Sequence, residues 1–159
     1  MPTLPLKRLI LVAVALLIAL PAFAQETPEP GGTAIIILGS DPETLNIGTS
    51  TSYPGGSVSA NVFSGLVRTS AEGWHEGDLA DSWTVSDDNL VYTFTLEPGA
   101  KFANGTPVNA EAVVASFERA RSDAATAQIR DKWGPVDTIV AEDDNTVVIT
   151  LNRPSHAWL

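Results

Sequence analysis

Few residues in this chain are of the types that do chemistry, and they are scattered. The two histidines, His75 and His156, lie far apart in the sequence. His75 has Trp74, Glu72 and Glu76 as neighbours, and such a set could contribute ligands to a metal ion. A lone histidine is more often structural or exposed than a ligand, so we expect no metal and no cofactor.

Two further groups carry polar atoms. Asp87-Asp88 and Asp143-Asp144 are each followed by an asparagine, which is typical of solvated hairpin turns rather than of an acid/base pair. The segment 47–56 is rich in Gly, Ser and Thr and has no charged residue, so it could line a polar cleft or form a plain surface loop. The chain has no Gly-rich phosphate loop, nucleophile elbow or zinc-ligand spacing. We therefore expect a protein that is not an enzyme.

The elements around the hydroxyl-rich segment follow from the pattern of apolar residues. The run 34–38 is continuously apolar and β-branched, which predicts a strand over 33–39 that is buried on both faces. The turn-rich loop 40–46 follows it. Apolar spacing downstream predicts a helix within 57–68, capped by Ser57 or Ser59 and leading into a strand.

The middle of the chain predicts two hairpins and a helix. Asn109 is a good helix cap, and Tyr92, Phe94 and Leu96 share one face of a strand. We read 69–78 as a connector and 122–133 as a looser second helix stopped by Gly134-Pro135. The expected elements are strands over 82–86, 90–96, 136–141 and 146–151, and a helix over 110–121.

The first 24 residues have the layout of a secretory signal peptide. Lys7 and Arg8 precede an apolar run of 12 residues, Leu9–Leu20, and Ala22-Phe23-Ala24 is a small-x-small cleavage site. A membrane-spanning helix needs roughly 20 apolar residues. We expect the mature chain to begin near Gln25 and residues 25–32 to be flexible.

The charge and the cysteine content limit the compartments in which the protein can function and the partners that it can bind. The chain has 9 basic and 19 acidic residues, so loss of Lys7 and Arg8 leaves 7 against 19, a net charge of −12. This balance argues against nucleic acid and against an anionic membrane surface. The absence of cysteine excludes disulfides and a lipidated cysteine. A soluble protein of a Gram-negative periplasm fits best, with secretion as the alternative.

Three spaced motifs run through the middle of the chain. They are Leu79-Ala80-x-Ser82-Trp83, Tyr92-x-Phe94-x-Leu96 and Lys101-Phe102-x-x-Gly105-Thr106-Pro107-Val108-x-Ala110-Glu111-x-Val113-x-x-Ser116-Phe117-x-Arg119. This set resembles the extracellular solute-binding proteins of family 5, the periplasmic dipeptide-, oligopeptide- and nickel-binding components of ABC importers. The upstream Asp41-Pro42-x-Thr44-Leu45 and the hairpin Asp144-x-Thr146-Val147-x-Ile149-x-Leu151 fit the same family, although members commonly read Leu-Asp-Pro where this chain has Leu45-Asn46-Ile47.

The resemblance implies a mixed α/β fold, an incomplete lobe of the type II periplasmic-binding-protein class. Residues 33–159 would be the N-terminal part of the solute-binding domain, with an inserted subdomain at about 60–153, and the chain would continue beyond Leu159. It also implies a monomer that captures peptides or similar small solutes and delivers them to an ABC permease. The implied ligand-facing residues are Ser40, Ser50, Thr51 and Tyr53.

The same resemblance implies that the motif residues are mostly scaffold. Trp83, Phe94, Phe102 and Phe117 would be core and Gly105 a turn requirement. Two alternatives stay open: a nickel- or metal-chelate-binding member of the same family, and a stand-alone secreted structural or adhesin-like domain. We also expect Arg153–Leu159 to begin a new helix and to leave Trp158 exposed.

Overall fold

The computed structural model describes residues 31–155 and residue 158. The predicted signal peptide and residues 25–30 lie outside the described residues, as do residues 156, 157 and 159 of the predicted C-terminal helix. The described residues of that stretch, 153–155 and 158, are not helical. The chain divides into two units, Met1–Ile36 and Ile37–Leu159. In the first unit the described residues 31–36 form no helix or strand.

The predicted strand over 33–39 is wrong for this structure. Ile35 and Ile37 are 88% and 92% exposed, and no residue of the stretch pairs with a described strand. An apolar strand is stable only when neighbouring strands take its backbone hydrogen bonds and other elements cover its faces. Nothing in the described part of the chain supplies either, so the stretch is extended and exposed.

The helix α2, Tyr53–Ser59, begins four residues before the predicted one. Its cap is Ser52, whose Oγ accepts a hydrogen bond from the Gly55 N–H at 3.3 Å, and Pro54 stands in its first turn. Ser57 is therefore inside the helix and Ser59 ends it, so neither is the cap. The cap signal was present at Ser52 and Pro54, but Gly55-Gly56 weakens the helical pattern.

A two-stranded antiparallel sheet follows, formed by β1, Val67–Thr69, and β2, His75–Gly77. The sequence predicted a connector over most of this stretch, so β2 was missed. A Cβ at Gly77 would lie 2.1 Å from the Ala80 carbonyl oxygen, so only glycine permits this close approach of the backbone.

The main sheet joins the two predicted hairpins. Strands β3, Ala80–Val85, and β4, Val91–Leu96, form one hairpin, and β5, Val136–Ala141, and β6, Thr146–Leu151, form the other. The order is β3-β4-β6-β5, with every pair antiparallel and Phe94 opposite Val147 where the hairpins meet. All four strands lie within two residues of their predicted bounds.

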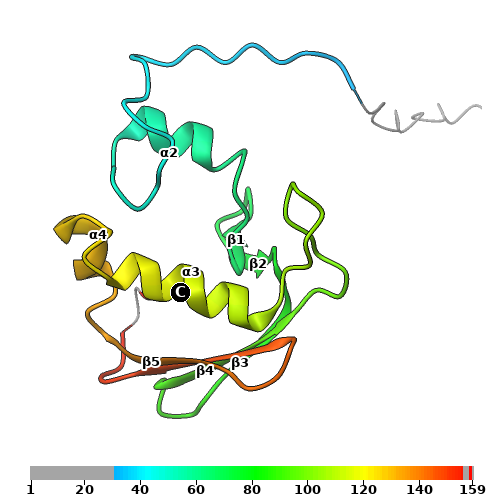
Figure 1. The fold of residues 1–159 in the computed structure, drawn as a ribbon, viewed down its shortest axis with the longest axis vertical. Helices are drawn as coiled ribbons and strands as arrows, with labels where there is room; N and C mark the ends of the chain where they lie inside the picture. Colours follow the sequence, from blue (N-terminus) through cyan, green and yellow to red (C-terminus); the bar gives the residue numbers. More distant parts are fainter. Residues whose placement is uncertain (1–30, 156–157, 159) are drawn as a thin grey trace, which may run out of the picture. The chain divides into compact units, whose positions relative to one another are not determined.

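One face of this sheet is covered by α3, Ala110–Arg121, as Figure 1 shows. The helix has its predicted bounds and its predicted cap, since Asn109 Oδ1 accepts a hydrogen bond from the Ala112 N–H at 3.0 Å. The short helix α4, Ala127–Lys132, follows it. The core fills the space between helix and sheet, with Phe94, Leu96, Ile149 and Val147 as its largest fully buried side chains.

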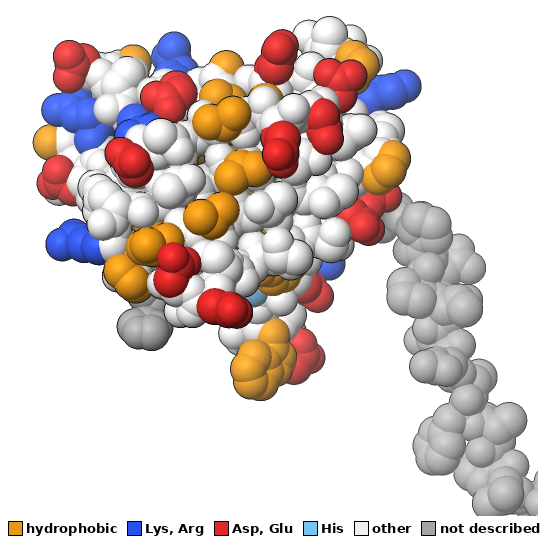
Figure 2. Space-filling view, turned by 90° about the horizontal axis from the view of Figure 1, so that it is seen from below, with side chains coloured by type: hydrophobic (Ala, Val, Ile, Leu, Met, Phe, Trp, Pro, Cys, Tyr) orange, Lys and Arg blue, Asp and Glu red, His pale blue; other side chains and the backbone are white. Residues whose placement is uncertain are grey.

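The opposite face of the sheet carries a short row of apolar side chains among acidic and neutral ones (Figure 2). Val140 is 51% exposed and lies opposite Val148 in the β5–β6 register, while its neighbour Ile139 is buried on the helix side. This alternation is the ordinary pattern of an antiparallel sheet covered on one side.

Predictions for four aromatic residues need correction or refinement. Phe102 is 49% exposed, because it lies in the turn closed by the Lys101–Pro107 bridge and not over the sheet. Trp83 and Phe117 are half-buried and pack against the core. Trp158 is also half-buried rather than exposed, with its ring centre 4.9 Å from that of Tyr92. Within residues 31–155, no helix is long and apolar enough to span a membrane.

Candidate functional site

The loop before α2 is folded by its own polar side chains. Thr44 Oγ1 accepts a hydrogen bond from the Asn46 N–H at 3.0 Å, and Asn46 Oδ1 accepts one from the Gly48 N–H at 2.9 Å. The Asn46 carbonyl oxygen accepts a further bond from the Thr49 N–H at 3.1 Å. Such side-chain-to-backbone bonds fix a turn without a helix or strand.

Two hydrogen bonds attach this loop to the region of α4, far along the chain. The Gly48 carbonyl oxygen accepts from the Thr126 N–H at 3.1 Å, and the Thr51 hydroxyl donates to Gln128 Oε1 at 3.1 Å. Gly55 of α2 approaches the loop from the other side, where a Cβ would lie 3.1 Å from the Thr44 carbonyl oxygen. The loop is therefore held between α2 and α4.

A cavity of about 270 Å³, with both polar and apolar lining, lies where these three segments meet. Five of its residues carry a hydroxyl, so we call it the hydroxyl-lined cavity. One of these hydroxyls, Ser59 Oγ, is buried and has no hydrogen-bond partner among the described residues. The lining residues are Thr44, Asn46, Ile47, Ser50, Thr51, Ser52, Gly55, Gly56, Ser59, Ile129 and Lys132.

The structure brings together two of the four residues predicted to face a ligand. Ser50 and Thr51 both line the hydroxyl-lined cavity. Ser40 is exposed in the loop upstream and does not line it, and Tyr53 is 82% exposed at the start of α2. Sequence reasoning missed Ser59 and Lys132, because no local pattern indicates that α4 packs beside a loop some 80 positions earlier.

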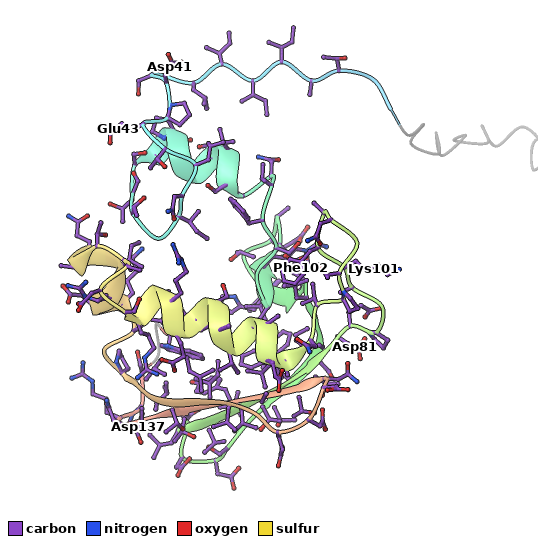
Figure 3. All side chains as sticks on the ribbon, viewed as in Figure 1. Asp41, Glu43, Asp81, Lys101, Phe102 and Asp137 are labelled. Carbon is purple, nitrogen blue, oxygen red and sulfur yellow. The ribbon has the colours of Figure 1, made fainter. Side chains whose placement is uncertain are left out.

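The charge on the lining of this cavity is of one sign. Among the described residues, Lys132 is the one charged residue that lines it, and no described acid does so, although the chain has 19 acids. Asp41 and Glu43 lie in the first part of the loop, before the lining residue Thr44, and Figure 3 shows both on the side away from α3. A cavity lined by one sign of charge concentrates solutes of the opposite sign.

Two further cavities adjoin the same loop, since Ile47 lines all three. The larger, of about 430 Å³, is mainly apolar and includes Phe63, Phe102 and Phe117 together with Lys101. Figure 3 shows Lys101 and Phe102 side by side in the turn after β4. The other, of about 420 Å³, is lined by Phe63, Arg119 and Ala120 among others. Ile47, at which the chain departs from the family's Leu-Asp-Pro pattern, is 54% exposed between these cavities.

The acid pairs behave as turn residues. The Ser86 hydroxyl donates to Asp88 at 2.5 Å, and this bond, with one from the Leu90 N–H, lowers the pKa of Asp88. Bonds from the Asn145 N–H and the Thr146 hydroxyl lower the pKa of Asp143. Hydrogen bonds to the charged form of a carboxyl favour that form.

The neighbourhood of His75 does not form a metal centre in the structure. His75 lies in β2 opposite Thr69, and the adjacent Glu76 pairs with Arg68 at 3.0 Å. Among residues 31–155, no three His, Asp or Glu side chains are placed to share a metal ion.

Comparison with known proteins gives consistent matches. The family model described as bacterial extracellular solute-binding proteins, family 5 Middle, matches residues 75–159, more than half of the chain. The probable D,D-dipeptide-binding periplasmic protein DdpA of Escherichia coli is 38% identical over 136 residues, which are 82% of this chain and 26% of that protein. The glutathione-binding protein GsiB of E. coli K12 is 33% identical over 125 residues, 79% of this chain and 24% of that protein.

A comparison of the fold with solved structures gives a consistent match. The crystal structure of Haemophilus influenzae OppA in complex with RPPGFSPFR matches with a TM-score of 0.71 and 25% identity, over 76% of this chain and 27% of OppA. This match supports the predicted lobe of the type II periplasmic-binding-protein class. The chain spans about a quarter of the length of the relatives that it matches.

Proposed function

Because the chain belongs to the bacterial extracellular solute-binding proteins of family 5, we propose that it is part of the ligand-capturing component of an ABC importer. A two-lobed binding protein of this kind closes around its solute and delivers it to a membrane permease. Neither step needs covalent chemistry, so we propose that the protein is not an enzyme and needs no cofactor.

The proposed ligands are peptides or similarly small solutes. The named relatives are a probable D,D-dipeptide-binding protein, a glutathione-binding protein and an OppA in complex with RPPGFSPFR. These three solutes all contain amide bonds and free ionic groups. Amides and carboxylates are bound in proteins by hydroxyl, amide and ammonium groups. The hydroxyl-lined cavity offers this combination, and it is the observation that carries the proposal.

Within this cavity, we propose that Ser50 and Thr51 contact the solute. Thr51 is already oriented by its bond to Gln128, and a hydroxyl that donates one bond can still accept others. Ser40 and Tyr53 also stay predicted contacts, but both side chains are exposed outside the cavity. They would contact the solute only when a second lobe closes on this face.

The domain assignment is part of the same proposal. Residues 33–159 would be the N-terminal part of the solute-binding domain, and the inserted subdomain at about 60–153 would comprise the two sheets with α3 and α4. The core of this subdomain supports that division, since its buried apolar residues come from 66–151. The net charge of −12 after signal cleavage and the periplasmic relatives support a soluble monomer in the periplasm.

The test is a binding assay on the protein as its gene encodes it, without the predicted signal peptide. Isothermal titration calorimetry would compare the dipeptide Ala-Ala, the tripeptide Ala-Ala-Ala and glutathione with Ni²⁺–histidine. We expect a peptide to bind with micromolar or lower Kd and the nickel chelate not to bind.

Binding of Ni²⁺–histidine alone would replace this proposal by the metal-chelate alternative. Binding of none of the four, by a protein that unfolds cooperatively, would favour the stand-alone structural alternative. If the proposal holds, Thr51→Val and Ser50→Ala are each expected to weaken peptide binding severalfold. Under either of the two alternative outcomes there would be no reason to expect this effect.

A further inference from the structure

Some basic residues of this chain form ion pairs with acids, and others line cavities without such a partner. In the described part of the chain, three cations form ion pairs with acids: Arg68 with Glu76, Arg121 with Glu118, and Arg130 with Asp123. None of these six residues lines one of the three cavities around Ile47.

The cavities show the reverse pattern. Among the described residues, each is lined by one cation, Lys132, Lys101 or Arg119, and by no acid. These three cations have no ion-pair partner among the residues that the structure describes, and neither does Arg153, which lines none of these cavities. With 19 acids against 9 bases in the chain, acid-free cavities are the opposite of what a random distribution would give. An unpaired cation beside a cavity favours an anionic occupant.

A second, independent observation selects the hydroxyl-lined cavity among the three. Ser59 is 7% exposed, and its Oγ is fully buried without a hydrogen-bond partner in the described structure. Buried hydroxyls in folded proteins nearly always have a partner, so one without a partner needs an explanation. Ser59 ends α2 and lines the same cavity as Lys132 of α4, and a solute oxygen there would complete its bonding.

We propose that the hydroxyl-lined cavity is an anchor for a carboxylate group of the solute, with the Lys132 ammonium as its charge partner and the Ser59 hydroxyl as a donor. The inference rests on the proposed function, because it names the group of the captured solute that this site recognises. A carboxylate accepts several hydrogen bonds, and a lysine ammonium is a compact point charge with three donors.

The other polar atoms of the cavity fit the same occupant. Ser50 can also donate to a carboxylate oxygen or to the adjacent amide, whereas no lining carboxylate would repel it. A cationic group of the solute would find no acid in this cavity and would have to be bound elsewhere. The site therefore distinguishes the two ends of a zwitterionic peptide.

The experiment compares solutes that differ only in the carboxylate. Calorimetry on the protein as its gene encodes it, without the predicted signal peptide, would use Ala-Ala, its amide Ala-Ala-NH₂, and Ala-Asp-NH₂. The first carries a terminal carboxylate, the second none, and the third a side-chain carboxylate. We expect both carboxylates, or one of them, to bind about tenfold or more tightly than Ala-Ala-NH₂. The preferred one identifies the source of the anchored group.

Three variants assign that preference to residues. Lys132→Gln is expected to abolish the preference for the carboxylate peptide over Ala-Ala-NH₂. Ser59→Ala is expected to weaken binding of the carboxylate peptide about threefold to tenfold. The same change should maintain or raise the Tm of the unliganded protein, because it removes an unsatisfied buried hydroxyl. Arg68→Gln makes the same change in net charge outside the cavities and is the control that should alter neither affinity.

The outcomes separate the two proposals. If the wild-type protein binds a carboxylate peptide and Lys132→Gln retains the full preference, the anchor is overturned and the proposed function stands. If Ala-Ala-NH₂ binds as tightly as the carboxylate peptides, the anchor is likewise overturned. If none of the three peptides binds, the peptide-binding function fails together with the anchor.

Discussion

The junction between the two hairpins can be tested by removing the side chains that meet there. Phe94 of β4 and Val147 of β6 are directly opposite in the register and are 1% and 0% exposed. Val147→Ala removes two buried methyl groups, which costs about 1.6 kcal/mol in transfer free energy and about 2 to 3 kcal/mol once the cavity is included. Phe94→Leu is expected to cost about 1 to 3 kcal/mol.

The informative quantity is the coupling between the two changes. Opposite residues on one face of an antiparallel pair have Cβ atoms in contact, so the second change finds the first contact already lost. The double variant should therefore differ from the sum of the single variants by about 0.5 kcal/mol or more.

The assay is equilibrium urea unfolding of residues 25–159, followed by the fluorescence of the half-buried Trp83 and Trp133. The buried core of the helix and the two sheets is supplied entirely by residues 66–151, so we expect this segment to unfold cooperatively. The free energies of the wild type, both single variants and the double variant then give the coupling directly.

A matched control uses Val140→Ala in place of Val147→Ala. Val140 is 51% exposed on β5 and lies on the other face of the sheet, so its change should be small and additive with Phe94→Leu. A Phe94–Val147 coupling no larger than the Phe94–Val140 coupling would refute the β4–β6 pairing. A non-cooperative transition in the wild type would refute the independence of this core.

Further predictions concern single elements of the scaffold. Asn109→Ala should lower the free energy of unfolding by about 1 kcal/mol through loss of the α3 cap, and Asn109→Ser should retain most of it in the same urea assay. Gly105→Ala should lower the free energy of unfolding by about 1 to 2 kcal/mol, because Gly105 has φ +87°. Gly56 lies within α2 with open space around it, so Gly56→Ala should leave the free energy of unfolding unchanged or raise it by up to about 1 kcal/mol. The pKa of Asp143 is lowered in the folded state by its hydrogen bonds. These bonds therefore stabilise the fold at pH values above the unfolded pKa of about 3.9. This contribution is lost as the pH falls through the folded pKa. Carboxyl NMR titration should place the Asp143 midpoint below 3.8, and Asp143→Asn should reduce the loss of stability in acid.

Elements whose signals are local were predicted closely from the sequence. The helix α3 has a polar cap, an acid in its first turn and arginines in its last, and its bounds are as predicted. The strands β5 and β6 are also as predicted, with Asp143-Asp144-Asn145 as their turn. In these cases the residues that decide the structure lie within one element.

Elements whose stability comes from distant partners were predicted less well. The run 34–38 is intrinsically suited to a strand, but it is exposed here because no described strand pairs with it. Phe102 belongs to the motif but is half exposed, because its turn does not cover the sheet. The β1–β2 hairpin depends on a glycine that permits close backbone contact at Ala80, which no sequence pattern reveals.

The candidate site shows the same division. Residue types and their spacing were enough to identify the family, the hydroxyl-rich segment with Ser50 and Thr51, and the lack of known catalytic motifs. The position of the loop against α4, which adds Lys132 to the cavity, could be seen only in the folded chain. So could the start of α2 at Tyr53, which places beside the cavity the Ser59 hydroxyl, without a hydrogen-bond partner among the described residues. Contacts between segments so far apart depend on how the helices pack, and packing is a property of the folded chain as a whole.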